Sequence, residues 1–232
     1  MNNAGQGPDG ELLTVFDGDP EAEAIMREFR EKIPSLNISS DNAQLVEQLR
    51  YKIEDVLAIC PDSPQKKAVV GIIVNAIATC FASFGIKYRE LIVIPEKMVG
   101  RMIMRASFAK IEKIKLNYLY IDPSRIISKI DLLVQFGLPV SLNITDILFV
   151  IVHEIAHMAQ FLHAEDAVYK SMRFEYEKSP RELHSDEVAL DYCRKLFNSL
   201  CGHGENKGCA KDILLSGLPM TIKRAEMYGR PI

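Results

Sequence analysis

The chain has 232 residues, a length that suits one domain with a substantial hydrophobic core. Hydrophobic residues make up 48% and charged residues 25% of it, which is ordinary usage for a globular protein. The formal net charge of −3 gives no basis for a broad nucleic-acid-binding surface, so we expect no nucleic-acid partner. The five cysteines are odd in number and form no C-x-x-C pair, which argues against a disulfide framework and against a zinc ribbon.

Residues 1–20 are expected to form a mobile N-terminal arm, followed by a single domain over residues 21–232. The arm lacks the basic stretch and apolar run of a secretory signal, so we expect a cytoplasmic location; the alternative is export, as an effector or toxin, by a route that needs no N-terminal signal. The first part of the domain, residues 21–86, is expected to be helical, with helices near 21–33, 42–59 and 64–85.

The helix expected at 64–85 carries no charged residue between Ala68 and Gly85, a length at the lower edge of a membrane span. However, Ser63 and Pro64 form a typical helix start, and small or polar residues make a stripe at helical spacing. We therefore interpret this segment as a buried helix in a domain that does not enter a membrane.

The second part of the domain, residues 87–232, mixes the two kinds of element. Segments rich in Ile, Val, Tyr and Leu predict strands near 88–94 and 116–121, with a weaker one near 102–108. Further helices are expected from Asp122–Pro123 onward and at about 145–163, 180–200 and 209–227, with a polar loop between the second and third of these. The fold class is therefore α+β, mostly helical with a small sheet.

The helix expected at 145–163 contains the motif His153-Glu154-Ile155-Ala156-His157. Residues four apart lie on one face of a helix, so His153 and His157 can bind one zinc ion together. Zinc lowers the pKa of a bound water from about 15.7 to about 7, and Glu154 is placed to take its proton as general base. The surrounding helix is apolar nearly all round, and burying these three side chains without partners would cost several kcal/mol. We therefore predict one Zn²⁺ per chain; the alternative is two hydrogen-bonded core histidines, with Glu154 paired to a cation.

Three residues are candidates for the third metal ligand. Glu182 lies in the first turn of a helix expected to begin at Pro180, and Asp186, one turn later, can accept the N–H of a ligand histidine. We expect Glu182 to be the ligand. Glu187 offers the same kind of pair on another face of the helix.

His163 is the third candidate, because its spacing from His157 matches a longer motif, H-E-x-x-H-x-x-G-x-x-H. That motif needs a glycine to end the helix and turn the chain back to the metal. Gln160 stands at this position, so a continuing helix would carry His163 away from the metal.

Residues 145–195 resemble the gluzincins, metallopeptidases in which a glutamate on a second helix completes an H-E-x-x-H site. Glu182, Asp186 and Ala189 match the gluzincin pattern P-x-E-x-E-A-D-x-x-A, whereas His184 and Ser185 depart from it. The resemblance implies a zincin-like domain with a small sheet packed beside the active-site helix. It also implies an edge strand that binds an extended substrate, for which residues 116–121 are our candidate.

The function expected on these grounds is hydrolysis of peptide bonds in a protein or peptide substrate by a zinc metallopeptidase. Two alternatives stay open: a zinc amidase acting on a non-peptide or cell-wall amide, and a catalytically silent zincin-like binding domain. The intact Glu154 argues against the silent domain, because holding zinc does not require a base. Tyr169, Tyr176 and His184 are possible donors to an oxyanion, although an ordinary structural role suits each of them better.

Overall fold

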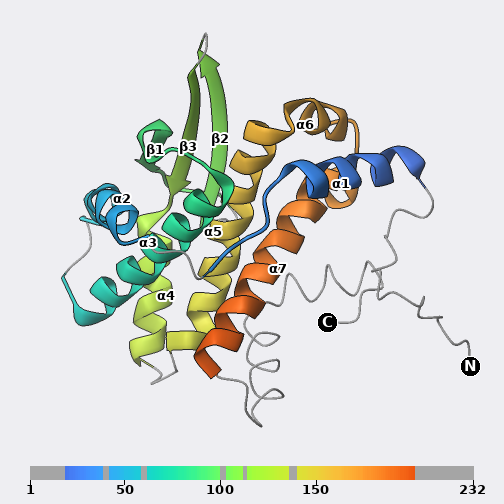
Figure 1. The fold of residues 1–232 in the computed structure, drawn as a ribbon. Helices are drawn as coiled ribbons and strands as arrows, with labels where there is room; N and C mark the ends of the chain where they lie inside the picture. The colour runs from blue at the N-terminus through green and yellow to red at the C-terminus, as the bar shows by residue number, and fades with distance from the viewer. Residues whose placement is uncertain are drawn as a thin grey trace, which may run out of the picture.

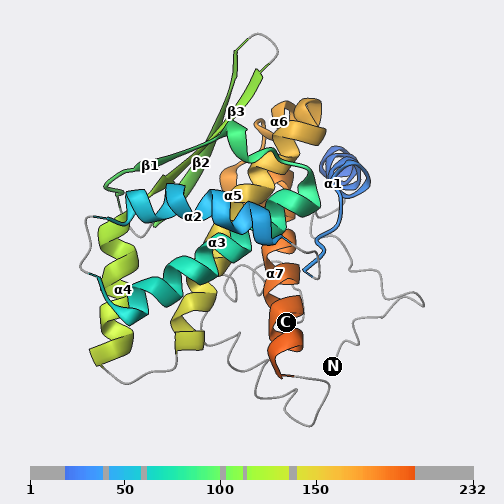
Figure 2. The same ribbon diagram turned by 60° about the vertical axis from the view of Figure 1, so that its left-hand side comes forward.

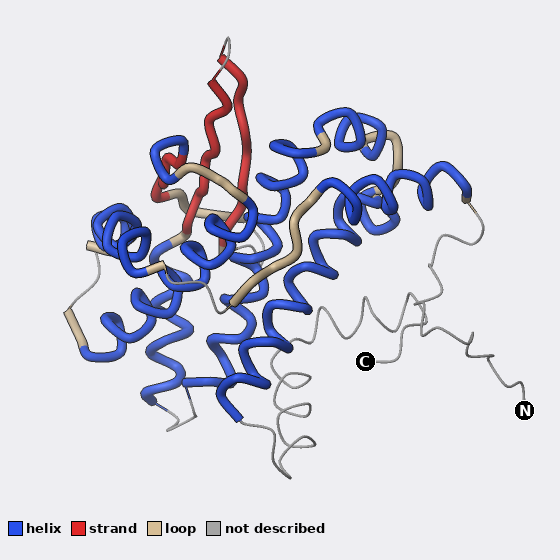
Figure 3. Tube along the Cα trace, viewed as in Figure 1, coloured by secondary structure: helices blue, strands red, loops and turns tan. Residues whose placement is uncertain are grey.

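The computed structural model describes residues 19–38, 42–58, 62–99, 103–111, 114–135 and 140–201. Most of the expected N-terminal arm and the helix expected at 209–227 lie outside these residues. The described helices are α1 (Pro20–Lys32), α2 (Ala43–Val56), α3 (Pro64–Phe84), α4 (Pro123–Gln135), α5 (Val140–His163), α6 (Glu165–Ser171) and α7 (Pro180–Cys201). The strands are β1 (Leu91–Pro95), β2 (Met104–Ile111) and β3 (Ile114–Ile121), with single 3-10 turns at Tyr88–Glu90 and Tyr176–Lys178. The expected mixed, mostly helical α+β class is confirmed (Figures 1 and 3).

Helix α3 begins and ends where its sequence predicts. The Ser63 hydroxyl accepts the Lys66 N–H at 3.0 Å, and Pro64 occupies the first turn, where its missing N–H costs nothing. Gly85 closes the helix in the left-handed conformation, with φ 65°, a geometry that glycine adopts without strain.

Helix α3 also passes a length-and-composition test for a membrane span over Lys66–Phe84. Of that segment, 56% is buried inside the protein, and a core helix of a soluble protein passes the same test. Helices α5 and α6 would pass as one broken span, although they are bent by 117° at their junction. The expectation that the domain does not enter a membrane therefore stays a prediction.

The three strands form one sheet in the order β1-β3-β2, with β1 parallel and β2 antiparallel to β3. Residues 116–121 belong to β3, which is paired on both sides, so our candidate edge strand was wrong. The edge beside helix α5 is β2, which contacts that helix (Figure 2). Strand order depends on pairing between distant segments, and the local sequence pattern of a strand does not specify it.

Helix α5 runs through the middle of the molecule, in contact with α3 on one side and α7 on another (Figures 1 and 2). Strands β2 and β3 pack against the C-terminal end of helix α5. The Lys115 ammonium donates to the carbonyls of Phe161 and Leu162 at 3.0 and 3.3 Å, and the rings of Phe108 and Phe161 stack at 3.8 Å. These contacts fix the sheet edge relative to the helix that carries the motif.

The segment expected to be a polar loop after α5 contains helix α6 and the 3-10 turn at Tyr176–Lys178. Helix α6 forms because Ala167, Val168 and Ser171 are buried against neighbouring helices. It has seven residues, too few to produce the repeated apolar spacing by which helices are recognised in a sequence.

Candidate metal centre

His153 and His157 on α5 meet Glu182 in the first turn of α7. All three residues are buried, with 7%, 8% and 2% of their surface exposed. The Nε2 atoms of the two histidines are 3.1 Å apart, and Glu182 Oε2 lies 3.3 and 3.4 Å from them. These three residues form a group that could hold one metal ion.

Each histidine can offer its Nε2 to a metal ion at this point, because its Nδ1 is engaged with another side chain. His153 Nδ1 donates to Asp186 Oδ1 at 2.9 Å, and His157 Nδ1 donates to Gln160 Oε1 at 2.9 Å. A neutral imidazole that donates from Nδ1 carries a lone pair on Nε2. Asp186 thus occupies the supporting place expected from its position one turn after Glu182.

Glu182 presents one oxygen to the group and uses the other elsewhere. Its Oε1 accepts from the Arg181 guanidinium at 2.7 and 3.2 Å. Its Oε2 is the one buried side-chain polar atom in the described residues that has no hydrogen-bond partner. Such an atom is rare in folded proteins and calls for a missing ion or solvent molecule, so the donor set fits a bound cation.

The electrostatics of the group also favour a positive charge at its centre. Burial disfavours a charged His153, but Asp186 and Glu182 outweigh this and raise the pKa of His153 to about 10. Burial opposes the ionised form of Glu182 as well, yet the adjacent imidazoles hold the pKa of that carboxyl far below its usual range. A cation can therefore be held here despite the cost of burying it.

Glu154 lies next to His153 in the chain and faces the sheet. Its Oε2 accepts the backbone N–H of Ala106, on β2, at 2.6 Å. Because this N–H points away from β3, it belongs to the unpaired edge of the sheet. The motif carboxylate and the free edge of β2 are therefore adjacent.

The other two ligand candidates are engaged elsewhere. Glu187 accepts from the guanidinium of Arg30, on α1, at 2.7 and 3.2 Å. His163 donates to the Phe84 carbonyl, at the C-terminal end of α3, at 2.7 Å. Neither belongs to the buried group formed by His153, His157 and Glu182.

Of the three suggested oxyanion donors, the two tyrosines are exposed and the histidine is buried. Tyr169 and Tyr176 are 53% and 58% exposed, on α6 and the turn after it. His184 is buried, and its Nδ1 lies 3.1 Å from Gln160 Nε2. Burial lowers the pKa of His184 to about 4, so this imidazole is neutral near pH 7.

Sequence reasoning missed three contributors to this site. Gln160 appeared only as the residue that replaces a glycine, although its spacing of three from His157 places both on one helix face. Arg181 could have been recognised from the sequence, because it directly precedes the predicted ligand Glu182. Ala106 could not, because it contributes a backbone N–H whose position depends on how the sheet is paired.

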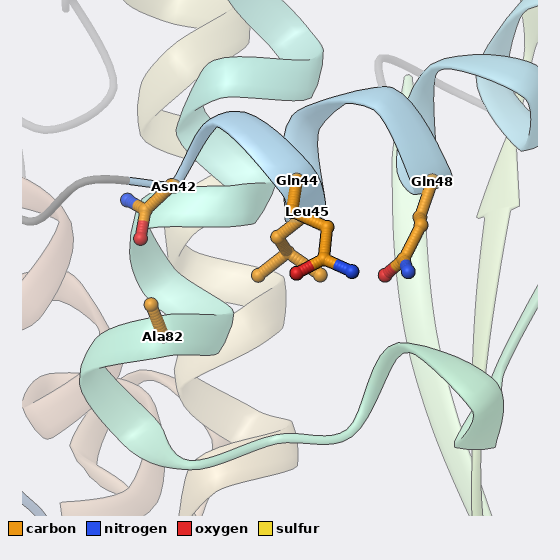
Figure 4. A pocket seen from close by; sticks show the side chains of 5 residues that line it. All are labelled: Asn42, Gln44, Leu45, Gln48 and Ala82. Carbon is orange, nitrogen blue, oxygen red and sulfur yellow. The ribbon is translucent and has the colours of Figure 1, made fainter.

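A shallow hollow of about 400 Å³ lies between α2 and α3 (Figure 4). Its lining consists of Asn42, Gln44, Leu45, Gln48 and Ala82. These side chains include amides but no imidazole, thiol or carboxylate, so the hollow has no group suited to acid–base or metal chemistry.

Comparison of the chain with protein-family models, with curated proteins and with solved structures found no match of any of the three kinds.

Proposed function

We propose that this protein is a zinc-dependent metallopeptidase. The observation that carries the proposal is the convergence of His153 Nε2, His157 Nε2 and Glu182 Oε2, each oriented by a partner of its own. Two imidazoles and one carboxylate are a ligand set of catalytic zinc sites, which keep a fourth position for water. Structural zinc sites are instead closed by four protein ligands, usually with thiolates among them.

Bound zinc would polarise a substrate carbonyl and lower the pKa of a water at the fourth position. Glu154 is the proposed general base for that water. The Ala106 N–H holds its Oε2, so the carboxylate is fixed in place and Oε1 is the oxygen we assign to proton transfer. The same carboxyl group can then pass the proton to the leaving amine.

The adjacent edge of β2 favours a peptide as the substrate. In an antiparallel pair, alternate residues direct both backbone groups away from the partner strand. Since the Ala106 N–H points outward, Phe108, two residues on, directs its N–H and carbonyl to the same edge. An extended peptide could pair with these groups and bring its backbone alongside Glu154.

The test is the variant Glu154→Gln, assayed for zinc content and for cleavage of a fluorogenic peptide library. The amide cannot accept the proton, so we expect zinc to be retained and cleavage to be lost. Glu187→Gln is the matched control, since it removes a carboxylate from outside the metal group. Parent-level cleavage by Glu154→Gln would remove Glu154 as the base, and cleavage of cell-wall amides but no peptides would redirect the proposal to an amidase.

A further inference from the structure

Gln160 is completely buried, with 0% of its surface exposed, at the contact between α5 and α7. Its carbonyl oxygen faces His157 Nδ1 at 2.9 Å. Its amide nitrogen lies 2.8 Å from the Arg181 carbonyl oxygen, 3.1 Å from Ser185 Oγ and 3.1 Å from His184 Nδ1. One side chain thus touches a ligand histidine on α5 and the first turn of α7.

The Arg181 carbonyl determines which way the Gln160 amide points. A carbonyl oxygen only accepts hydrogen bonds, so the NH₂ end of the amide must face it. The Oε1 end then faces His157, where it can only accept. His157 must therefore donate from Nδ1, which leaves the lone pair on Nε2, the atom directed at His153 and Glu182.

The same amide fixes the position of the third ligand. Arg181 directly precedes Glu182, and its carbonyl is bound to a side chain rooted in the histidine helix. A shift of α7 along α5 would break this bond. Asp186, by comparison, contacts His153 and does so from α7 itself.

We propose that Gln160 is a positioning residue for two of the three metal ligands. It holds His157 in the tautomer that presents Nε2, and it anchors the first turn of α7 so that Glu182 Oε2 reaches the same point. This inference rests on the proposed metal centre, and part of its test is independent of metal.

The metal-independent test is the tautomer of His157, read from imidazole ¹⁵N shifts of the metal-free protein. If Gln160 is replaced, Ser185 Oγ, 3.1 Å from His157 Nδ1, could accept the hydrogen bond in its place. The decisive comparison is therefore made without the serine hydroxyl, between the single variant Ser185→Ala and the double variant Ser185→Ala/Gln160→Met. Methionine keeps the length of glutamine and removes its polar atoms. We expect a pure Nδ1–H tautomer in the first variant and a mixture in the second; the same pure tautomer in both would overturn the proposal.

The second test measures zinc affinity and the visible spectrum of the cobalt(II) form, whose bands report coordination geometry. We expect Gln160→Met to weaken zinc binding about 10–100-fold, the usual effect of losing a partner of a metal ligand, and to shift the cobalt bands. Gln160→Glu keeps an acceptor for His157 and should recover part of the affinity. Ser171→Ala, which removes an equally buried hydrogen bond on α6, should leave both readouts unchanged.

The results separate this inference from the proposed function. Parent-like affinity and spectra in both Gln160 variants would show that the side chain only fills space, and would overturn the inference. A parent protein that binds neither zinc nor cobalt would overturn the proposed function, whereas the tautomer comparison would still decide whether Gln160 orients His157.

Discussion

Replacing each candidate third ligand by a neutral residue should separate them by their effect on zinc affinity. Glu182→Gln removes the charged oxygen 3.3–3.4 Å from both imidazoles, whereas Glu187→Gln and His163→Gln alter groups bound to Arg30 and to the Phe84 carbonyl. Losing the partner of a ligand costs about 10–100-fold in affinity, so losing the ligand itself should cost more than about 100-fold, or about 2.7 kcal/mol.

The two comparison variants should change stability and leave zinc affinity unchanged. The Arg30–Glu187 pair is partly exposed, at 41% and 20% of the two side chains, so its loss should lower the unfolding free energy by about 0.2–1 kcal/mol. Loss of the His163 hydrogen bond should cost about 1 kcal/mol. Competition with a chromophoric chelator at fixed pH gives the affinities. The assignment of Glu182 is refuted if either comparison variant shows the largest loss while Glu182→Gln binds zinc normally.

Three further predictions concern stability. Free zinc at 100 times its Kd should stabilise the fold by about 2.7 kcal/mol. Removing the zinc with a chelator should therefore lower the melting temperature by about 5–10 °C, and an unchanged melting curve would contradict this. Lys115→Met should lower the unfolding free energy in urea by about 1–2 kcal/mol without changing zinc content, because it releases the sheet from the carbonyls of Phe161 and Leu162. Burial lowers the pKa of His184 to about 4, with Glu187 and Arg30 acting in opposite directions, so the unfolded chain binds more protons between about pH 4 and 6.5. As pH falls through this window, the parent should lose stability relative to His184→Gln, by at most about 1.4 kcal/mol per pH unit, and parallel pH profiles would argue against a neutral buried imidazole.

The parts of the fold that could be predicted from the sequence are those with local causes. The Ser63–Pro64 start and the Gly85 end of α3 each depend on the backbone preferences of a few residues. The spacing of His153 and His157 likewise follows from helix geometry alone. Such features need no knowledge of the rest of the chain.

The parts that could not be predicted depend on contacts between distant segments. The order of the sheet places β2 at the edge, and the Ala106 N–H reaches Glu154 only because of that order. The role of Gln160 depends on the Arg181 carbonyl, 21 residues away in sequence. Short helix α6 is held by burial against its neighbours and carries too little periodicity to be recognised.

The most direct test of the proposed metal centre is the metal content of the untagged protein, measured by elemental analysis beside Glu182→Ala. We predict about one zinc per chain in the parent, because three buried ligand atoms converge within 4.8 Å of one another. The variant should lose most of that zinc. A folded parent protein that binds no zinc, even when zinc is supplied in excess, would contradict the account.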